Sequence, residues 1–176
     1  MTHIKYGNDV TSDYTYDADT LRLDNILTKK PDGTTKLQDL TYIFDNNGNV
    51  TKITDTVNSM SQDFTYDDLN RLTQGIGSAY GTQNFAYDSI GNMTTKDTRT
   101  LSYGAGSAGP HAVTSVSWTN NEMPTFCRDY ASGSCNMTYD SNGNMTVRGG
   151  DNLSYDSQNR LTEVKLHEGD SGTTNY

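Results

Sequence analysis

The residues of this chain with the clearest capacity for covalent chemistry are its two cysteines. Cys127 and Cys135 lie eight positions apart in the stretch Cys-Arg-Asp-Tyr-Ala-Ser-Gly-Ser-Cys. At this spacing they could form a disulfide or remain two unpaired thiols. A zinc site is disfavoured, because no second Cys or His pair accompanies them at the spacing of a zinc finger. The cysteines by themselves therefore leave the disulfide and the free thiols both open.

Two acidic loops, Asp45–Asn49 and Asp140–Asn144, have the oxygen-rich composition of calcium-binding loops. An EF-hand loop requires Gly at position six and Glu at position twelve, whereas here Gly falls at position four and no Glu follows. The three histidines, His3, His111 and His167, are far apart in the sequence. The sequence contains no hydrolase nucleophile elbow, phosphate loop or zinc-protease motif. We therefore expect turns rather than ion sites, no cofactor and no enzymatic activity.

The two acidic loops belong to an internal repeat. Met137 and Tyr139 alternate with polar residues, a short loop containing Gly follows, and Met145 and Val147 resume the alternation. Two runs of period two around such a loop predict a β-hairpin. Similar copies begin at Leu40, Phe64, Phe85 and Leu153, and a less regular copy begins at Tyr14. This repetition predicts a stack of successive hairpins.

The turn of the repeat has a physical explanation. Asp at its first position can accept hydrogen bonds from backbone amides two residues further on. The fourth position is Gly or Asn, which tolerate the left-handed conformation of a type I turn followed by a bulge. The expected turn residues are Asp45, Gly48, Asp67, Asn70, Asp88, Gly91, Asp140, Gly143, Asp156 and Asn159. The copy at Tyr14 has Thr20 in the fourth position and an extra residue before Arg22, so we expect a different loop there.

The residue before each turn is expected to build the core of the sheet. It is aromatic in every copy, as Tyr16, Phe44, Tyr66, Tyr87, Tyr139 and Tyr155. Aliphatic core residues are scarce, as in disordered chains, but the twelve tyrosines lie in register with Phe, Leu and Met at two-residue spacing. Disordered segments lack aromatics and such a period. The predicted fold class is all-β, a thin sheet of antiparallel hairpins with one largely polar face and little or no helix.

Charge and hydropathy exclude two classes of partner. The formal net charge is −9, whereas a nucleic-acid-binding surface requires basic residues that displace counterions from phosphates. The same charge opposes binding to an anionic membrane surface. No apolar run approaches the roughly 20 residues of a transmembrane helix. We therefore expect no nucleic-acid partner and no membrane insertion.

The motifs Tyr-Asp-x-x-Gly-Asn and Tyr-Asp-x-x-Asn-Arg-Leu resemble the YD repeats of the Rhs and wall-associated protein family. That family includes the shell-forming parts of bacterial insecticidal toxin complexes and the animal teneurins. The stretch Gly109–Val116 also resembles a segment common in bacterial Rhs proteins. The resemblance, which covers residues 14–164, implies a curved or spiralling sheet of hairpins that forms a hollow shell. Because the family acts outside the cytosol, it also implies that Cys127 and Cys135 form a disulfide, which would stiffen the loop between them.

The repeat pattern divides the chain into five segments. These are an N-terminal edge segment (1–13), hairpins (14–103), a loop and insertion with the cysteines (104–136), hairpins (137–167) and a flexible tail (168–176). Since members of the family are usually far longer, we expect this chain to be a piece of a longer protein.

The favoured function is a non-catalytic structural protein that is extracellular or at the cell surface. An open stack of hairpins leaves two edge strands with unpaired backbone groups. We therefore expect copies of the chain, or neighbouring repeat segments, to associate edge to edge, and to give a filament or tube where the contact does not close. Two alternatives remain. One is a carbohydrate-binding or adhesive module that binds surface glycans, and the other is a fragment of a toxin-enclosing shell.

Overall fold

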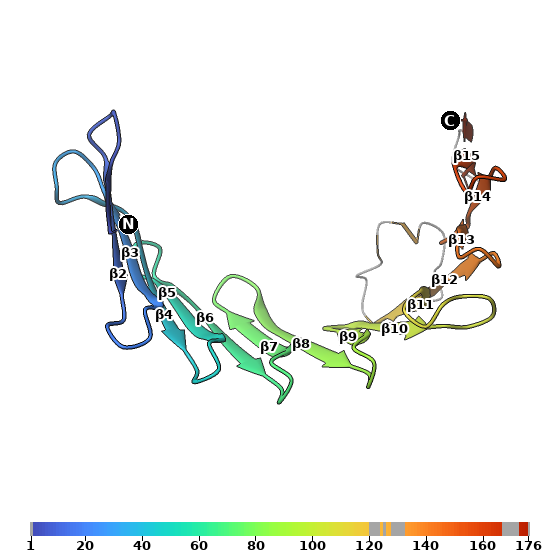
Figure 1. The fold of residues 1–176 in the computed structure, drawn as a ribbon, viewed down its shortest axis with the longest axis horizontal. Coiled ribbons are helices and arrows are strands. Elements are labelled where there is room, and N and C mark those ends of the chain that lie inside the picture. The colour runs from blue at the N-terminus through green and yellow to red at the C-terminus, as the bar shows by residue number, and fades with distance from the viewer. Residues whose placement is uncertain (1, 120–123, 125, 128–132, 167–172, 176) are drawn as a thin grey trace. The chain divides into compact units, whose positions relative to one another are not determined.

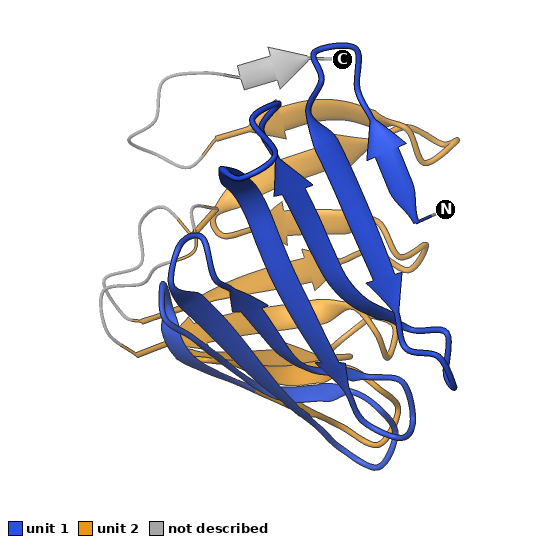
Figure 2. Cartoon of the chain, turned by 90° about the vertical axis from the view of Figure 1, so that its left-hand side faces the viewer, with its two compact units in different colours: residues 1–84 blue, residues 85–176 orange. Residues whose placement is uncertain are grey.

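The computed structural model describes residues 2–119, 124, 126, 127, 133–166 and 173–175. This part of the chain contains sixteen β-strands and turns and no helix (Figure 1). It divides into two compact units, residues 1–84 and 85–176 (Figure 2). The boundary between them lies inside strand β8 (Gly81–Tyr87), whose first part pairs within unit 1 and whose second part pairs within unit 2. The predicted all-β class of antiparallel hairpins is confirmed.

Unit 1 is a twisted antiparallel sheet in which each strand pairs only with its neighbours in the sequence (Figure 2). Its strands before β8 are β1 (His3–Lys5), β2 (Thr11–Tyr16), β3 (Leu23–Lys29), β4 (Lys36–Phe44), β5 (Val50–Asp55), β6 (Met60–Tyr66) and β7 (Leu72–Gly77). Such a meander follows from the sequence, because each polar turn is too short for anything but an antiparallel return.

Unit 2 continues the same pattern of antiparallel pairing between successive strands. Its strands after β8 are β9 (Met93–Lys96), β10 (Arg99–Tyr103), β11 (Val113–Trp118), β12 (Ser134–Tyr139), β13 (Met145–Arg148), β14 (Asp151–Tyr155), β15 (Leu161–Lys165) and β16 (Thr173–Asn175). Residues 168–172 and 176 of the predicted tail lie outside the described residues, whereas 173–175 form β16. The five segments proposed from the repeat pattern remain a prediction.

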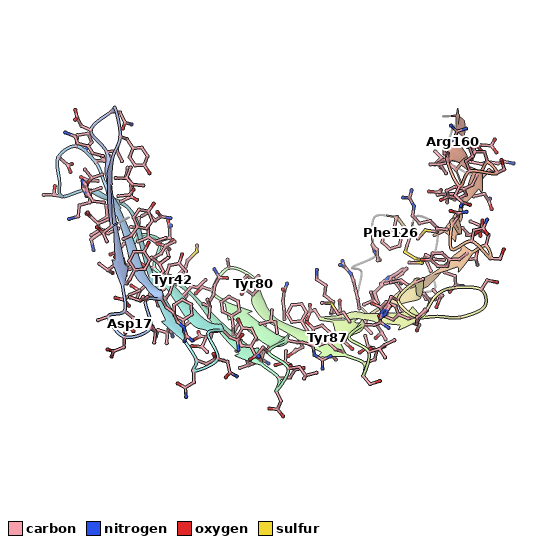
Figure 3. All side chains as sticks on the ribbon, in the orientation of Figure 1. Asp17, Tyr42, Tyr80, Tyr87, Phe126 and Arg160 are labelled. Carbon is pink, nitrogen blue, oxygen red and sulfur yellow. A yellow bond between two sulfur atoms is a disulfide. The ribbon has the colours of Figure 1, made fainter. Side chains whose placement is uncertain are left out.

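The register of unit 1 gathers apolar side chains on one side of the sheet. Across neighbouring strands, Tyr14 lies opposite Ile26 and Ile26 opposite Leu40, while Tyr42 lies opposite Ile53. We call this surface the apolar face of unit 1; it comprises Tyr14, Ile26, Leu40, Tyr42, Ile53 and Phe64. Tyr42 and Tyr80 project from the same side of the sheet (Figure 3). These six side chains are only half-buried, because the sheet has no second layer in the described part of this unit.

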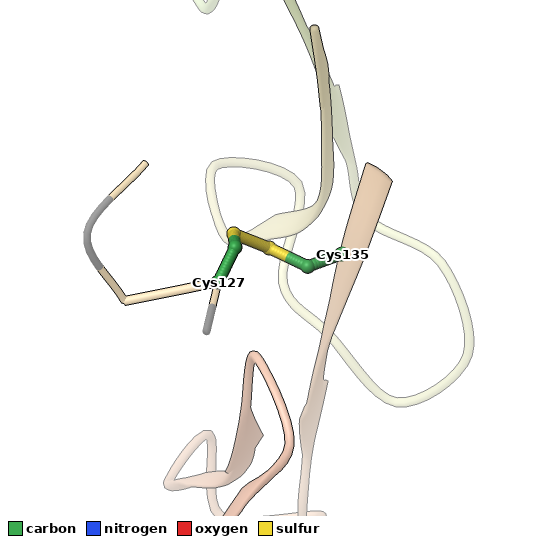
Figure 4. The surroundings of a disulfide bond; sticks show 2 residues. All are labelled: Cys127 and Cys135. Atoms are coloured by element: carbon green, nitrogen blue, oxygen red, sulfur yellow. A yellow bond between two sulfur atoms is a disulfide. The ribbon is translucent and has the colours of Figure 1, made fainter. Parts of the chain in front are cut away.

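Unit 2 differs because a segment of its insertion covers the sheet. Val116 on β11 lies opposite Cys135 on β12, and Cys135 is bonded to Cys127 of the insertion (Figure 4). Phe126 lies beside this disulfide (Figure 3). The insertion also approaches the β13–β14 turn so closely that a Cβ atom at Gly149 would collide with the carbonyl oxygen of Phe126. The predicted disulfide is therefore present in the structure and ties the insertion to the sheet.

Candidate functional site

Every hairpin of the repeat carries the same irregularity just before its turn. The pairing register shifts at the residue that precedes the aromatic position, as between Thr65 and Tyr66 or between Thr138 and Tyr139. One residue of the return strand is left without an opposite partner, which defines a β-bulge. In the five regular copies and in the hairpin β10–β11, which has the same register shift, that residue is Thr, namely Thr51, Thr73, Thr94, Thr114, Thr146 and Thr162. The bulge brings the aromatic residue and the apolar residue after the turn opposite each other, as with Tyr66 and Leu72.

The bulge threonines use their hydroxyl groups to join the two strands of the hairpin. Thr51 and Thr162 donate to the carbonyl oxygens of Ile43 and Ser154, at 3.3 and 3.1 Å. In the hairpin β12–β13, the hydroxyls of Thr138 and Thr146 are 2.9 Å apart. These contacts compensate for the ladder bonds that a bulge interrupts. The bulge threonines had a signal in the sequence, since Thr recurs two residues after the fifth turn position. The hairpin pattern alone did not show that their hydroxyls join the two strands.

Each of the five regular turns is closed by its Asp carboxylate. In the turn at Asp140, one carboxylate oxygen accepts from the backbone amides of Asn142 and Asn144, both at 2.9 Å, and the other accepts from Asn144 Nδ2, also at 2.9 Å. In the turn at Asp67 the fifth residue is Arg71, and its Nε donates to the carboxylate at 2.7 Å. The fifth position therefore needs a side chain that can donate, which Asn and Arg both supply.

These hydrogen bonds stabilise the charged form of the carboxylates. The side-chain amides of Asn49 and Asn144 hold the pKa of Asp45 and of Asp140 below its usual value. In the turn at Asp67, the backbone amide of Arg71 is the main cause of a lowered pKa, and its guanidinium adds to the effect. The turn carboxylates are thus held in their charged form, and in two turns an arginine of the same turn neutralises that charge.

The fourth turn position adopts the left-handed conformation in all five regular copies. The φ angles are 96° at Gly48, 92° at Gly91, 85° at Gly143, and 59° at both Asn70 and Asn159. In the first copy the loop is one residue longer, because Asp17 N pairs with the Arg22 carbonyl and Leu21 takes the positive φ of 58°. The sequence correctly indicated a different loop there but placed Thr20 in this position.

Asparagine side chains join neighbouring turns to each other. In unit 1, Asn47 and Asn49 both donate to Asn70 Oδ1, at 3.0 and 2.8 Å. In unit 2, Asn142 and Asn144 both donate to Asn159 Oδ1, at 3.2 and 2.9 Å. We call this arrangement the asparagine clasp. Its recurrence in both units shows that it is a feature of the repeat and not of one loop.

Two further contacts join turns where the clasp does not occur. The guanidinium of Arg22 donates to the carbonyl of Asp45 at 2.6 Å and lies 5.7 Å from the centre of the Phe44 ring. In unit 2, Asn92 Nδ2 donates to the carbonyl of Pro110 at 2.9 Å, and the Asn92 amide oxygen lies 2.6 Å from Nδ1 of His111. The hairpin copies alone did not predict that Arg22 would bridge two turns.

In three hairpins a tyrosine hydroxyl connects the repeat to the one before it. Tyr66 donates to the carbonyl of Val50 at 2.8 Å, where the return strand of the previous hairpin begins. The Tyr103 hydroxyl donates to the Met93 carbonyl at 2.8 Å, and the Tyr139 hydroxyl donates to the Val113 carbonyl at 2.9 Å. Burial raises the pKa of all three phenols. The aromatic position therefore has a polar function in addition to the apolar one proposed from the sequence.

The six aromatic residues predicted to build the core vary in their burial. Phe44, Tyr66, Tyr87, Tyr139 and Tyr155 are half-buried. Tyr16 is 44% exposed, in the copy with the longer loop. In unit 1 the aromatic ring lies along an uncovered sheet, so it cannot reach the full burial of a two-layer core, and in unit 2 Tyr139 borders an open pocket beside Phe126.

Comparison with known proteins identifies the repeat. A family profile described as RHS Repeat matches residues 44–83, which hold the turns at Asp45 and Asp67 with the asparagine clasp between them. The chain contains an RHS repeat. The resemblance to the YD-repeat family is confirmed over these residues, and hairpins with a similar turn recur in both compact units. No curated protein matches the sequence significantly.

Solved structures show the same fold. The chain is similar to a component of the Tc holotoxin pore of Photorhabdus luminescens, with 23% identity, a TM-score of 0.62 and coverage of 99% of this chain and 10% of that one. It is also similar to a chain of the complex TcdB2-TccC3-Cdc42, with 25% identity, a TM-score of 0.50 and the same coverage. The RHS-repeat chain therefore spans about a tenth of the length of these proteins.

The polar side chains of these turns take part in hydrogen bonds within the sheet. In the described part of the chain, no group of three or more His, Cys, Asp or Glu side chains is arranged to hold a metal ion. Both oxygens of the turn carboxylates are engaged by amide or guanidinium donors within their own turn, as at Asp140 and Asp67. The described residues also include no helix long and apolar enough to cross a membrane.

Proposed function

We propose that this chain is a non-catalytic wall segment of an extracellular RHS-repeat shell or scaffold. The observation that carries the proposal is the set of contacts between repeats. Neighbouring hairpins are joined by strand pairing, by tyrosine hydroxyls and by the asparagine clasp, all within one layer of sheet. Such a layer grows by adding hairpins at its edge and encloses space without needing a compact core.

The free edge of unit 1 supports association with further repeat segments. Thr2 O accepts from Tyr14 N, and Tyr6 N donates to Val10 O, so the residues in even positions of this segment bond to β2. Because bonding alternates along an antiparallel pair, the amides of His3 and Lys5 point away from β2. An edge with outward amides is a template for another strand.

A proline substitution tests this edge. Lys5→Pro removes the outward amide while leaving the bonds to β2 in place, because proline is tolerated where the N–H faces away from the sheet. Lys5→Ala is the matched control, since it removes the same side chain and keeps the amide. We expect electron microscopy and size-exclusion chromatography at micromolar concentration to show assemblies for the wild type and Lys5→Ala, and fewer for Lys5→Pro. A strictly monomeric wild-type protein would contradict edge-to-edge association.

The matched structures favour a toxin-enclosing shell as the setting of this wall segment. One of them is a Tc holotoxin pore, and the matching chains of both are about ten times as long as this one. A coding sequence that continues beyond this chain into a C-terminal effector would support the shell. A gene that encodes only repeats would favour the free scaffold.

Carbohydrate binding is a second candidate, favoured by a groove in unit 1. This groove has a volume of 340 Å³ and is lined by Tyr42, Phe44, Asp17, Asp24 and Asp45 among others. Aromatic rings beside carboxylates can contact the apolar face and the hydroxyls of a sugar. On a glycan array, Tyr42→Ala should then lose binding that Tyr14→Ala retains. A wild-type protein that binds no glycan would rule this function out.

A further inference from the structure

Two turns of the repeat contain the dipeptide Asn-Gly at the same position. These are Asn47-Gly48 in unit 1 and Asn142-Gly143 in unit 2. Both asparagines are exposed, and in both the side-chain nitrogen is one of the two donors of an asparagine clasp. The glycine that follows has no Cβ atom to obstruct the approach of its nitrogen to the asparagine side chain.

This combination allows a spontaneous reaction that needs only water. The backbone nitrogen of the glycine attacks Cγ of the asparagine, a new C–N bond forms, and the side-chain nitrogen leaves as ammonia. The resulting cyclic imide then takes up one water molecule, and opening of the ring gives aspartate or isoaspartate. The net change is asparagine plus water to an acid plus ammonia, with no oxidation or reduction.

We propose that Asn142 and Asn47 are deamidation sites, that Asn142 reacts first, and that the reaction opens the asparagine clasp between neighbouring repeats. The proposal is independent of the proposed function, because it depends only on the geometry of the turns.

The order follows from the restraints on the two turns. The glycine amides are held similarly, since Gly48 N and Gly143 N donate to the first Asp carbonyl at 3.2 and 3.1 Å. The turn at Asn47, however, is also held by Arg22. Its guanidinium donates to the Asp45 and Asn46 carbonyls at 2.6 and 3.3 Å and lies 3.1 Å from where a Gly48 Cβ would be.

Among the described residues, no arginine contact comparable to that of Arg22 restrains the turn in unit 2. No described atom outside the neighbouring residues lies within 4 Å of a Cβ placed at Gly143. The clasp bond of Asn142 is 3.2 Å long, against 3.0 Å for Asn47. The turn at Asn142 therefore reaches the cyclised conformation at a smaller energetic cost.

The same two turns contain internal controls. Asn49 and Asn144 precede Val50 and Met145, whose side chains hinder attack by the backbone nitrogen. Their amide nitrogens are also held more firmly, each by an Asp carboxylate at 2.8 or 2.9 Å and by the clasp acceptor. They should remain intact while Asn142 and Asn47 react.

Deamidation replaces a donor by a negatively charged acceptor. At Asn142 the new carboxylate would face Asn159 Oδ1, which now accepts from Asn142 and Asn144. One hydrogen bond is lost and two acceptors are brought together, which is unfavourable. The junction between the last two YD turns would therefore loosen.

The test is peptide mass spectrometry of the purified protein during incubation in mildly alkaline buffer. We expect the amide-to-acid mass change first in the peptide with Asn142, later in that with Asn47, and not at Asn49 or Asn144. Arg22→Gln should accelerate the reaction at Asn47 and leave the rate at Asn142 unchanged. Equal rates at Asn142 and Asn144, or an Asn47 rate that is insensitive to Arg22, would overturn the assignment.

A second measurement tests the consequence for the clasp. Asn142→Asp imitates one product, and Ser141→Asp adds the same charge at the exposed neighbouring position. We expect Asn142→Asp to lower the melting temperature and to speed hydrogen exchange at the Asn159 turn, relative to Ser141→Asp. If the two variants behave alike, the clasp is not weakened by deamidation.

Discussion

Unit 1 leaves the apolar face of its sheet half-buried, whereas in unit 2 a segment of the same unit covers part of its own sheet. Val116, Cys127, Cys135 and Met137 are buried, and all belong to unit 2. In the described part of unit 1, the buried side chains are polar, those of Ser12 and Asp39. The hairpins themselves are alike, with the same bulge, turn and clasp.

This difference separates two sources of stability. A single layer of sheet cannot enclose large side chains, so unit 1 depends on hydrogen bonds within and between its repeats. Asp39 illustrates this, because hydrogen bonds from Lys36, Thr56 and Asn25 lower its pKa to about 2. Unit 2 adds a hydrophobic core, but only where the disulfide holds the insertion against β11 and β12.

An open pocket lies beside the insertion. It has a volume of 520 Å³ and is lined largely by apolar residues, including Leu101, Val113, Val116, Phe126, Met137 and Met145. The insertion therefore covers only part of the apolar side chains of unit 2.

The largest effect should come from truncating the covered core. Met137 is 6% exposed, so Met137→Ala is expected to lower the free energy of unfolding by about 2–4 kcal/mol. Leu40→Ala on the apolar face of unit 1 should cost about half as much, because Leu40 already contacts solvent. Urea denaturation of both variants measures the difference. Equal losses would show that the insertion does not create a distinct core.

Removal of the disulfide should affect unit 2 alone. Closing a loop of this length restricts the unfolded chain by about 2–3 kcal/mol, and that stabilisation is lost in the double variant Cys127→Ser/Cys135→Ser. Hydrogen exchange should accelerate in β11–β13 and stay unchanged in β3–β6. A reducing agent should speed hydrogen exchange in the wild type and should have no effect on the double variant. Acceleration in both units would contradict their separate stabilisation.

Loss of a tyrosine hydroxyl should have a smaller effect that is similar in the two units. Tyr66→Phe and Tyr139→Phe each leave a carbonyl without its donor, at a cost of about 1 kcal/mol. Tyr155→Phe serves as the control, since its hydroxyl has no hydrogen-bond partner among the described residues. Thermal melts of the three variants compare them directly. If Tyr155→Phe lowers the melting temperature as much as Tyr66→Phe and Tyr139→Phe do, the loss of the hydrogen bond is not the cause.

Acid should weaken the turns of both units in parallel, and each turn only slightly because its carboxylate is solvent-exposed. The turn aspartates have lowered pKa values in the folded state, so their contribution is present at neutral pH. It is lost as the pH falls through the folded pKa, below the unfolded value of about 4. Melting temperatures measured from neutral to acidic pH should decline in that range. A wild-type decline matched by Asp67→Asn and Asp140→Asn variants would exclude these carboxylates as its cause.

The sequence by itself determined the repeating unit. Alternation around Tyr139 and Met145 specified a hairpin, and the choice of Gly143 or Asn159 specified a left-handed residue, because few residues tolerate that conformation. These are local properties, set by the backbone preferences of a few consecutive residues. The resemblance to YD repeats added the disulfide, which the spacing of Cys127 and Cys135 alone had left open.

Only the tertiary structure decided how the repeats are joined and where a core forms. The bonds from Tyr66 to Val50 and from Asn47 to Asn70 connect residues 16 and 23 positions apart, and no local preference indicates such partners. The burial of Met137 likewise depends on an insertion with no repeat signature. A single layer of sheet acquires a buried core only where another part of the chain covers it, and that placement is a property of the folded molecule.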